Sequence, residues 1–63
     1  MEEQLEQYRD MSLALCYRLL NELNRNLHEA DRVFHGDIHK SYVDATEMAI
    51  AKANKSLKQI KNL

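Results

Sequence analysis

The sequence of 63 residues has no proline, no tryptophan, one glycine and one cysteine. The single cysteine, Cys16, cannot close a disulfide within the chain, and no pair of cysteines is available for a zinc site. Without a disulfide or a structural metal, a chain this short rarely gains more than about 3–5 kcal/mol from its own core. We therefore expect its stability to depend on a partner or on self-association.

Neither sign of charge dominates, since 9 Lys and Arg oppose 10 Asp and Glu for a formal net charge of −1. This balance argues against a general electrostatic attraction to nucleic acid or anionic lipid. No apolar run approaches the roughly 18 residues that span a bilayer. The acidic opening MEEQLEQYRD also differs from the basic start of a signal peptide. These features predict a small cytoplasmic protein.

The residues that dominate the chain are Ala, Leu, Glu, Lys, Gln and Arg, which favour helices. Apolar residues recur at alternating steps of three and four, which predicts a helix over 2–34, a turn over 35–40 and a helix over 41–62. Each helix presents a seam that we expect to form the hairpin core, with Thr46 as its polar member. Its other residues are Leu13, Cys16, Leu20, Leu23, Leu27, Ala30, Phe34, Val43, Ile50, Ala53, Leu57 and Ile60.

The two seams pair layer by layer when the chain is folded back at Gly36. Phe34 then faces Val43 and Cys16 faces Ile60, and the two residue numbers of each facing pair add to 76 or 77. The predicted fold is an all-α, antiparallel two-helix hairpin that packs like a coiled coil and occupies residues 1–63 as one domain. We expect a partner, or self-association into a four-helix bundle, to complete it.

The turn region RVFHGDIHKSYVD, residues 32–44, is the one stretch that resembles a site of chemistry. Its HGDIH string matches the catalytic loop of aminoglycoside-phosphotransferase-like kinases, but those enzymes need a nucleotide-binding lobe that a chain this short cannot supply. His35, Asp37 and His39 are legitimate metal ligands, yet three such residues on a turn are common by accident. We therefore predict no enzymatic activity, no metal and no cofactor.

Structural roles account for the same turn residues. Gly36 suits a left-handed backbone position at the end of the first helix, because it has no Cβ. Asp37 or Ser41 can cap the second helix by accepting hydrogen bonds from its first backbone N–H groups. His35 and His39 are then solvated turn residues. Within the seam, Cys16 is interpreted as a small apolar core residue.

Further apolar residues lie outside the seam, at heptad positions g and c, on one side of the hairpin. We call this side the apolar flank and expect it to bind a partner. The opposite side, the polar flank, is polar except for Tyr17. The partner-binding residues predicted on the apolar flank are Leu5, Tyr8, Ser12, Leu15, Leu19, Tyr42, Ala45 and Ala49. In the predicted register, residues 1–12 also project beyond the second helix.

The layout of nearly the whole chain resembles the small YscE-type co-chaperones of bacterial type III secretion needles. The likeness includes the acidic EEQLEQ opening, a long first helix, the Gly36-Asp37 dipeptide, the K-x-Y start at Lys40 and the alanine-rich ATEMAIAKA segment. The resemblance implies a hairpin that docks on a tetratricopeptide-like chaperone in the cytoplasm. Together the two proteins would keep the needle subunit monomeric before export.

A second hypothesis comes from a row of arginines. Arg18, Arg25 and Arg32 are spaced by seven residues and line the outer surface of the first helix. A homodimeric four-helix bundle could present this row to the phosphates of RNA or DNA. Glu22 and Glu29 lie one helical turn away and can pair with these arginines instead. The two functional hypotheses are therefore a secretion co-chaperone and, as the alternative, a nucleic-acid-binding regulator.

Overall fold

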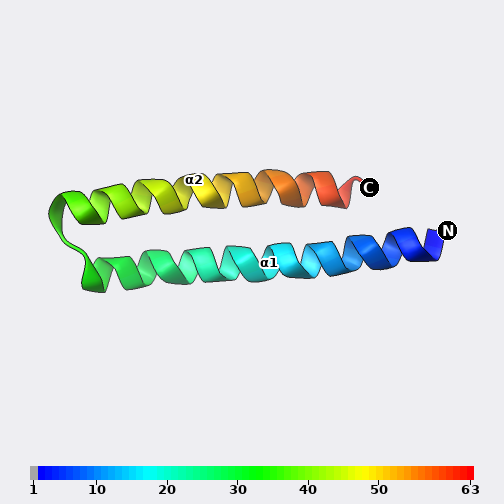
Figure 1. Ribbon diagram of the computed structural model, residues 1–63, viewed down its shortest axis with the longest axis horizontal. Helices are drawn as coiled ribbons and strands as arrows, with labels where there is room; N and C mark the ends of the chain where they lie inside the picture. Colours follow the sequence, from blue (N-terminus) through cyan, green and yellow to red (C-terminus); the bar gives the residue numbers. More distant parts are fainter. Residues whose placement is uncertain (1) are drawn as a thin grey trace.

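The computed structural model describes residues 2–63, which form two long helices (Figure 1). Helix α1 runs over Glu2–Val33 and helix α2 over Gly36–Lys61. Residues 2–63 contain no β-strand. The prediction of an all-helical chain with two helices is confirmed.

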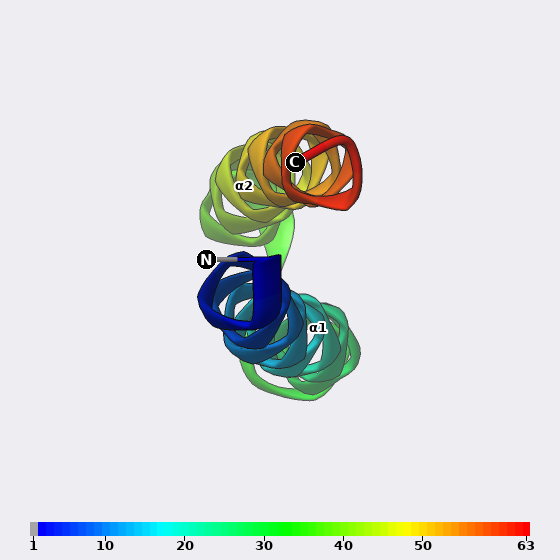
Figure 2. The same ribbon diagram turned by 90° about the vertical axis from the view of Figure 1, so that its right-hand side faces the viewer.

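The two helices lie side by side as a hairpin, with the connection at one end and both chain termini at the other (Figure 1). Seen end on, the helices are inclined to each other, so that they cross rather than run strictly parallel (Figure 2). The Cα trace measures 52 × 15 × 9 Å. Among the described residues no large side chain is fully buried. Each helix therefore has one covered face, and the rest of its surface is open.

The connection between the helices is shorter than the predicted turn over 35–40. Helix α2 begins at Gly36, five residues before the predicted start. Gly36 has a φ of +64° and is the only described residue with a positive φ, as expected for the glycine of this turn. Residues 37–40 are helical, and the N-cap is His35, whose side chain makes no capping hydrogen bond. The predicted caps at Asp37 and Ser41 are therefore wrong, although Asp37 in the first turn suits the helix dipole.

The shorter connection also changes the register of the hairpin. The Cys16 thiol donates a hydrogen bond to the Ala53 carbonyl oxygen (3.3 Å), whereas the prediction placed Cys16 opposite Ile60. Near the connection, the Nε2–H of His39 donates to Asp31 Oδ1 (2.7 Å). The residue numbers of these two pairs add to 69 and 70 instead of 76 or 77. The predicted register is therefore wrong by one heptad.

The seam keeps its residues despite this shift. Cys16, Leu20, Ala30, Ala53 and Thr46 are buried, and every other seam residue is half-buried. The Thr46 hydroxyl donates to the Tyr42 carbonyl oxygen (2.8 Å), which satisfies the one polar side chain of the seam. Four of these five buried residues are small, so the helices approach each other closely along the seam.

Candidate partner-binding surface

Two hollows show that the apolar flanks of α1 and α2 lie on one side of the hairpin. At the end that carries the termini, Leu5, Arg9 and Leu63 line a common hollow with Glu6. Nearer the connection, Val33 and Asn26 line another hollow together with Tyr42. In both hollows the g positions of the two helices meet, and a surface that spans both helices results.

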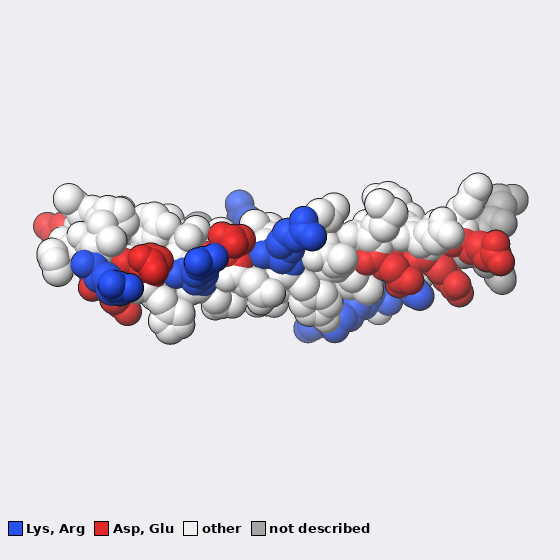
Figure 3. All heavy atoms as spheres, turned by 90° about the horizontal axis from the view of Figure 1, so that it is seen from below, with Lys and Arg blue, Asp and Glu red and all other residues white. Residues whose placement is uncertain are grey.

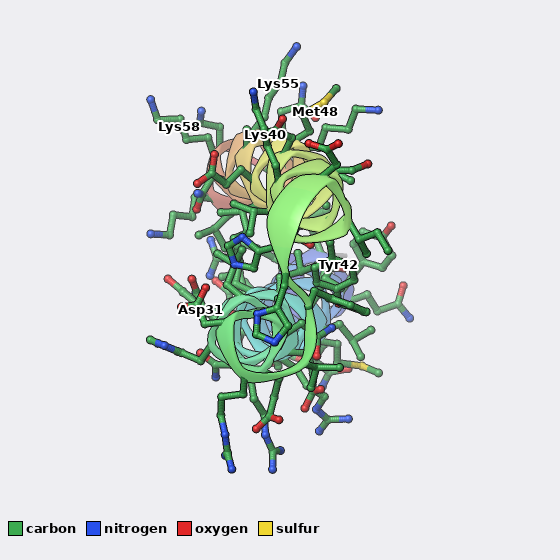
Figure 4. The ribbon with its side chains drawn as sticks, turned by 90° about the vertical axis from the view of Figure 1, so that its left-hand side faces the viewer. Asp31, Lys40, Tyr42, Met48, Lys55 and Lys58 are labelled. Atoms are coloured by element: carbon green, nitrogen blue, oxygen red, sulfur yellow. The ribbon has the colours of Figure 1, made fainter. Side chains whose placement is uncertain are left out.

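The polar flank lies on the opposite side and carries its own links between the helices. The hydrogen bond from His39 to Asp31 is one of them. The other is a cation–π contact, in which Lys61 Nζ lies 5.9 Å from the centre of the Tyr17 ring. Figure 4 shows Asp31 and Tyr42 on opposite sides of the hairpin. The links between polar side chains are therefore on one side and the open apolar surface on the other.

The α1 part of the apolar flank is strongly exposed. Leu5 is 53%, Tyr8 64%, Leu15 61% and Leu19 52% accessible to solvent. Ser12, which lies between them, is half-buried. Because these residues share one side of a single helix, they form an apolar strip with Ser12 at its middle. Such strips on soluble proteins usually mark interaction sites.

The α2 part of the flank lies nearer the connection and is more covered. Tyr42 and Ala49 are half-buried, and Ala45 is exposed. The Tyr42 ring packs against Phe34, with ring centroids 5.0 Å apart and an interplanar angle of 46°. This contact fixes Tyr42 beside a shallow hollow that Ile38 and Ala45 also line. The α2 part of the flank is thus a shaped surface rather than a protruding strip.

Six of the large apolar residues that are exposed in the described part of the chain were not among the predicted partner-binding residues: Met11, Tyr17, Val33, Ile38, Met48 and Leu63. Ile38 was missed because it was assigned to the turn, yet it precedes Ala45 by seven residues and continues the same row. That spacing was the signal that could have identified it. Met11 and Met48 lie at heptad position f, on the outer surface of the helices. The seam pattern gave no reason to expect a binding surface there. Met48 points away from α1, on the same side of the hairpin as Tyr42 (Figure 4).

The arginine row lies on the outer surface of α1. Arg25 Nη1 is 4.0 Å from Glu22 Oε1, and Arg32 Nη1 is 4.0 Å from Glu29 Oε1. Figure 3 shows basic and acidic side chains alternating over the half nearer the connection, and a row of acidic side chains with basic ones beside it over the half nearer the termini. The alternation divides the positive charge of the row into single, separated residues. It therefore supports a solvated charged face rather than a phosphate-binding strip.

His35, Asp37 and His39 were weighed above as metal ligands. Among the described residues, no three His, Cys, Asp or Glu side chains are grouped so that they could hold a metal ion. His35 is exposed at the connection. His39 is not the solvated turn residue that was predicted, because it belongs to the first turns of α2 and contacts Asp31.

Neither described helix combines the length and apolar character needed to cross a membrane. No protein-family model matches the chain, and no curated protein or solved structure shows significant similarity to it.

Proposed function

We propose that the chain is a binding protein, an antiparallel two-helix hairpin whose apolar flank docks on a larger helical partner. The observation that carries this proposal is the exposed strip of Leu5, Tyr8, Leu15 and Leu19 on α1. The seam already covers the inner face of α1, so the strip is apolar surface in excess of what the hairpin itself uses. Binding to a partner would remove that surface from water.

The spacing of the strip favours a groove as the binding site of the partner. Residues 5, 8, 12, 15 and 19 recur at steps of three and four, which is the pattern by which an amphipathic helix fills a hydrophobic groove. Tyr8 adds a ring with a polar tip, a residue type enriched in such contacts. Concave surfaces built from stacked helix pairs provide grooves of this kind.

The resemblance to YscE-type co-chaperones gives this partner a class. It implies a tetratricopeptide-like chaperone in the cytoplasm, with the hairpin serving as a scaffold that helps keep a needle subunit monomeric. A two-helix chain with a long first helix and one free apolar side supports this role. The histidines and the arginine row have no part in it.

Affinity purification of the full-length chain from its own host tests the proposal. We expect a tetratricopeptide-like protein and a small needle-like subunit to copurify with it. The variant Leu15→Lys with Leu19→Lys should lose both proteins, because two charges would be buried without counter-charges in the complex.

The matched control carries Asn21→Lys and Asn54→Lys, which add the same charge at exposed positions outside the apolar flank. It should retain both proteins at wild-type yield. The proposal fails if neither class of protein copurifies, or if the flank variant and the control retain the partners equally.

A further inference from the structure

The chain exposes more surface than a protein of its mass needs to. Its accessible surface is 5405 Å² at a mass of 7.4 kDa. A compact monomer of that mass exposes about 4,200 Å², so the excess is about 1,200 Å². A standard stable interface buries about 800 Å² on each partner. The excess is therefore large enough for one such interface on every copy of the chain.

The strip on α1 is complementary to itself when two copies run in opposite directions. Its steps of three, four, three and four place Ser12 at the centre. If two α1 helices cross at Ser12, Leu5 faces Leu19 of the second copy, and Tyr8 faces its Leu15. The small serine side chain at the centre lets the two helices approach closely, while the larger residues pack on either side.

The opposite orientation, with both connections at the same end, matches less well. In the observed register, Leu15 and Leu19 would then lie over Ser56 and Lys52 of the second copy, so that leucines would face polar side chains. In the crossing at Ser12, apolar residues face one another. No acidic side chain of α1 occupies a g or c position between Leu5 and Leu19, and Glu6, which lines the hollow beside Leu5, lies away from the crossing at Ser12.

We infer that a second copy of this chain covers the α1 strip, in a symmetric dimer whose two α1 helices cross antiparallel at Ser12. The dimer overlaps only in the halves that carry the termini. The α2 residues there meet as polar or partly polar groups, with Ser56 beside Gln59 of the second copy. Lys52 can lay its aliphatic stem on Leu63 of that copy and keep its ammonium group in water. The surface around Ile38 and Tyr42 stays open.

This inference does not depend on the identity of the partner in the proposed function. The partner and the second copy would use the same strip, so a bound partner would replace the second copy. Purified protein alone is enough for the test, and a failure of the dimer would leave the copurification experiment unaffected.

Disulfide trapping tests the geometry. In the full chain with Cys16→Ala, we introduce either Ser12→Cys or, as the matched control, Ala45→Cys, an exposed position on the flank near the connection. Under mild oxidation Ser12→Cys should form a covalent dimer at least roughly tenfold faster than Ala45→Cys, because the dimer raises the effective concentration of one thiol near the other. In guanidinium chloride the two rates should become equal.

Faster trapping of Ala45→Cys, or equal rates in native buffer, would overturn the proposed crossing. Sedimentation of the unmodified chain provides a second measurement that no substitution can disturb. At high micromolar concentration it should sediment with twice the 7.4 kDa mass of one chain. A 7.4 kDa species at all concentrations would overturn the dimer itself.

Discussion

Leu19 and Leu20 are neighbours in the sequence, yet Leu19 is 52% exposed and Leu20 is 9% exposed. Successive residues of a helix are separated by about 100° around its axis, so the two leucines face different surroundings. Leu20 enters the seam between the helices, whereas Leu19 stands on the apolar flank. Heptad position, rather than residue type, therefore decides which leucines fold the hairpin and which remain for binding.

The seam and the flank also differ in the size of their residues. Cys16, Ala30, Thr46 and Ala53 are among the most buried residues of the seam. The flank carries large side chains on α1 instead. Small seam residues bring the helices close together but bury little apolar area each, at about 25 cal/mol per Å². The larger area that remains on the flank becomes useful only when a second molecule covers it.

Truncation of Leu19 or Leu20 should show most strongly how the seam and the flank differ in their contribution to stability. Leu20→Ala removes a buried side chain from the seam and should destabilise the hairpin by about 2–5 kcal/mol, enough to collapse its helicity. Leu19→Ala removes a side chain that is already half in water and should change stability by less than about 1 kcal/mol. Thermal denaturation followed by circular dichroism measures both. Equal losses for the two variants would contradict the assignment of seam and flank.

The next largest effect on stability is expected from a disulfide that tests the register of the two helices. With Ala53→Cys, the native Cys16 should form an intramolecular disulfide that raises stability by about 2–4 kcal/mol. The matched variant Ile60→Cys places the second thiol where the predicted register would need it, and it should not cross-link efficiently. Non-reducing electrophoresis and melting curves with and without reductant distinguish the two. Efficient closure at residue 60 would restore the register in which Cys16 faces Ile60.

The sequence was sufficient to predict the two helices and the set of residues between them, but not their register. A slip of one heptad places Cys16 opposite Ala53 instead of Ile60 and leaves the same positions facing inward. The apolar pattern alone is therefore satisfied by both arrangements. The length of the connection decides between them, and a two-residue connection before Gly36 is a local backbone property that heptad spacing does not report.

The candidate surface was predictable to a similar extent. The g and c positions identified Leu5, Leu15 and Leu19 from spacing alone. Ile38 was missed as a consequence of the misplaced turn. The contact of His39 with Asp31 could not be foreseen, because it depends on the corrected register. In the predicted register, residues 1–12 projected alone, whereas the structure places Leu63 beside Leu5 and Arg9.

The smallest effect on stability is expected from substitutions on the apolar flank. In Leu15→Lys with Leu19→Lys, both ammonium groups can reach water from exposed positions, so the isolated hairpin should change by no more than about 0.5 kcal/mol. The helical signal should therefore match that of the wild type at high dilution. At higher concentration the two proteins should diverge, because association raises the melting temperature of the wild type only.

A concentration series of melting temperatures measures this divergence. A rising curve for the wild type and a flat one for the double variant would separate the surface that folds the chain from the surface that binds. A flat curve for both would mean that the flank does not associate with itself. If the double variant unfolds at high dilution as Leu20→Ala does, Leu15 and Leu19 belong to the folding core, and the division between seam and flank is wrong.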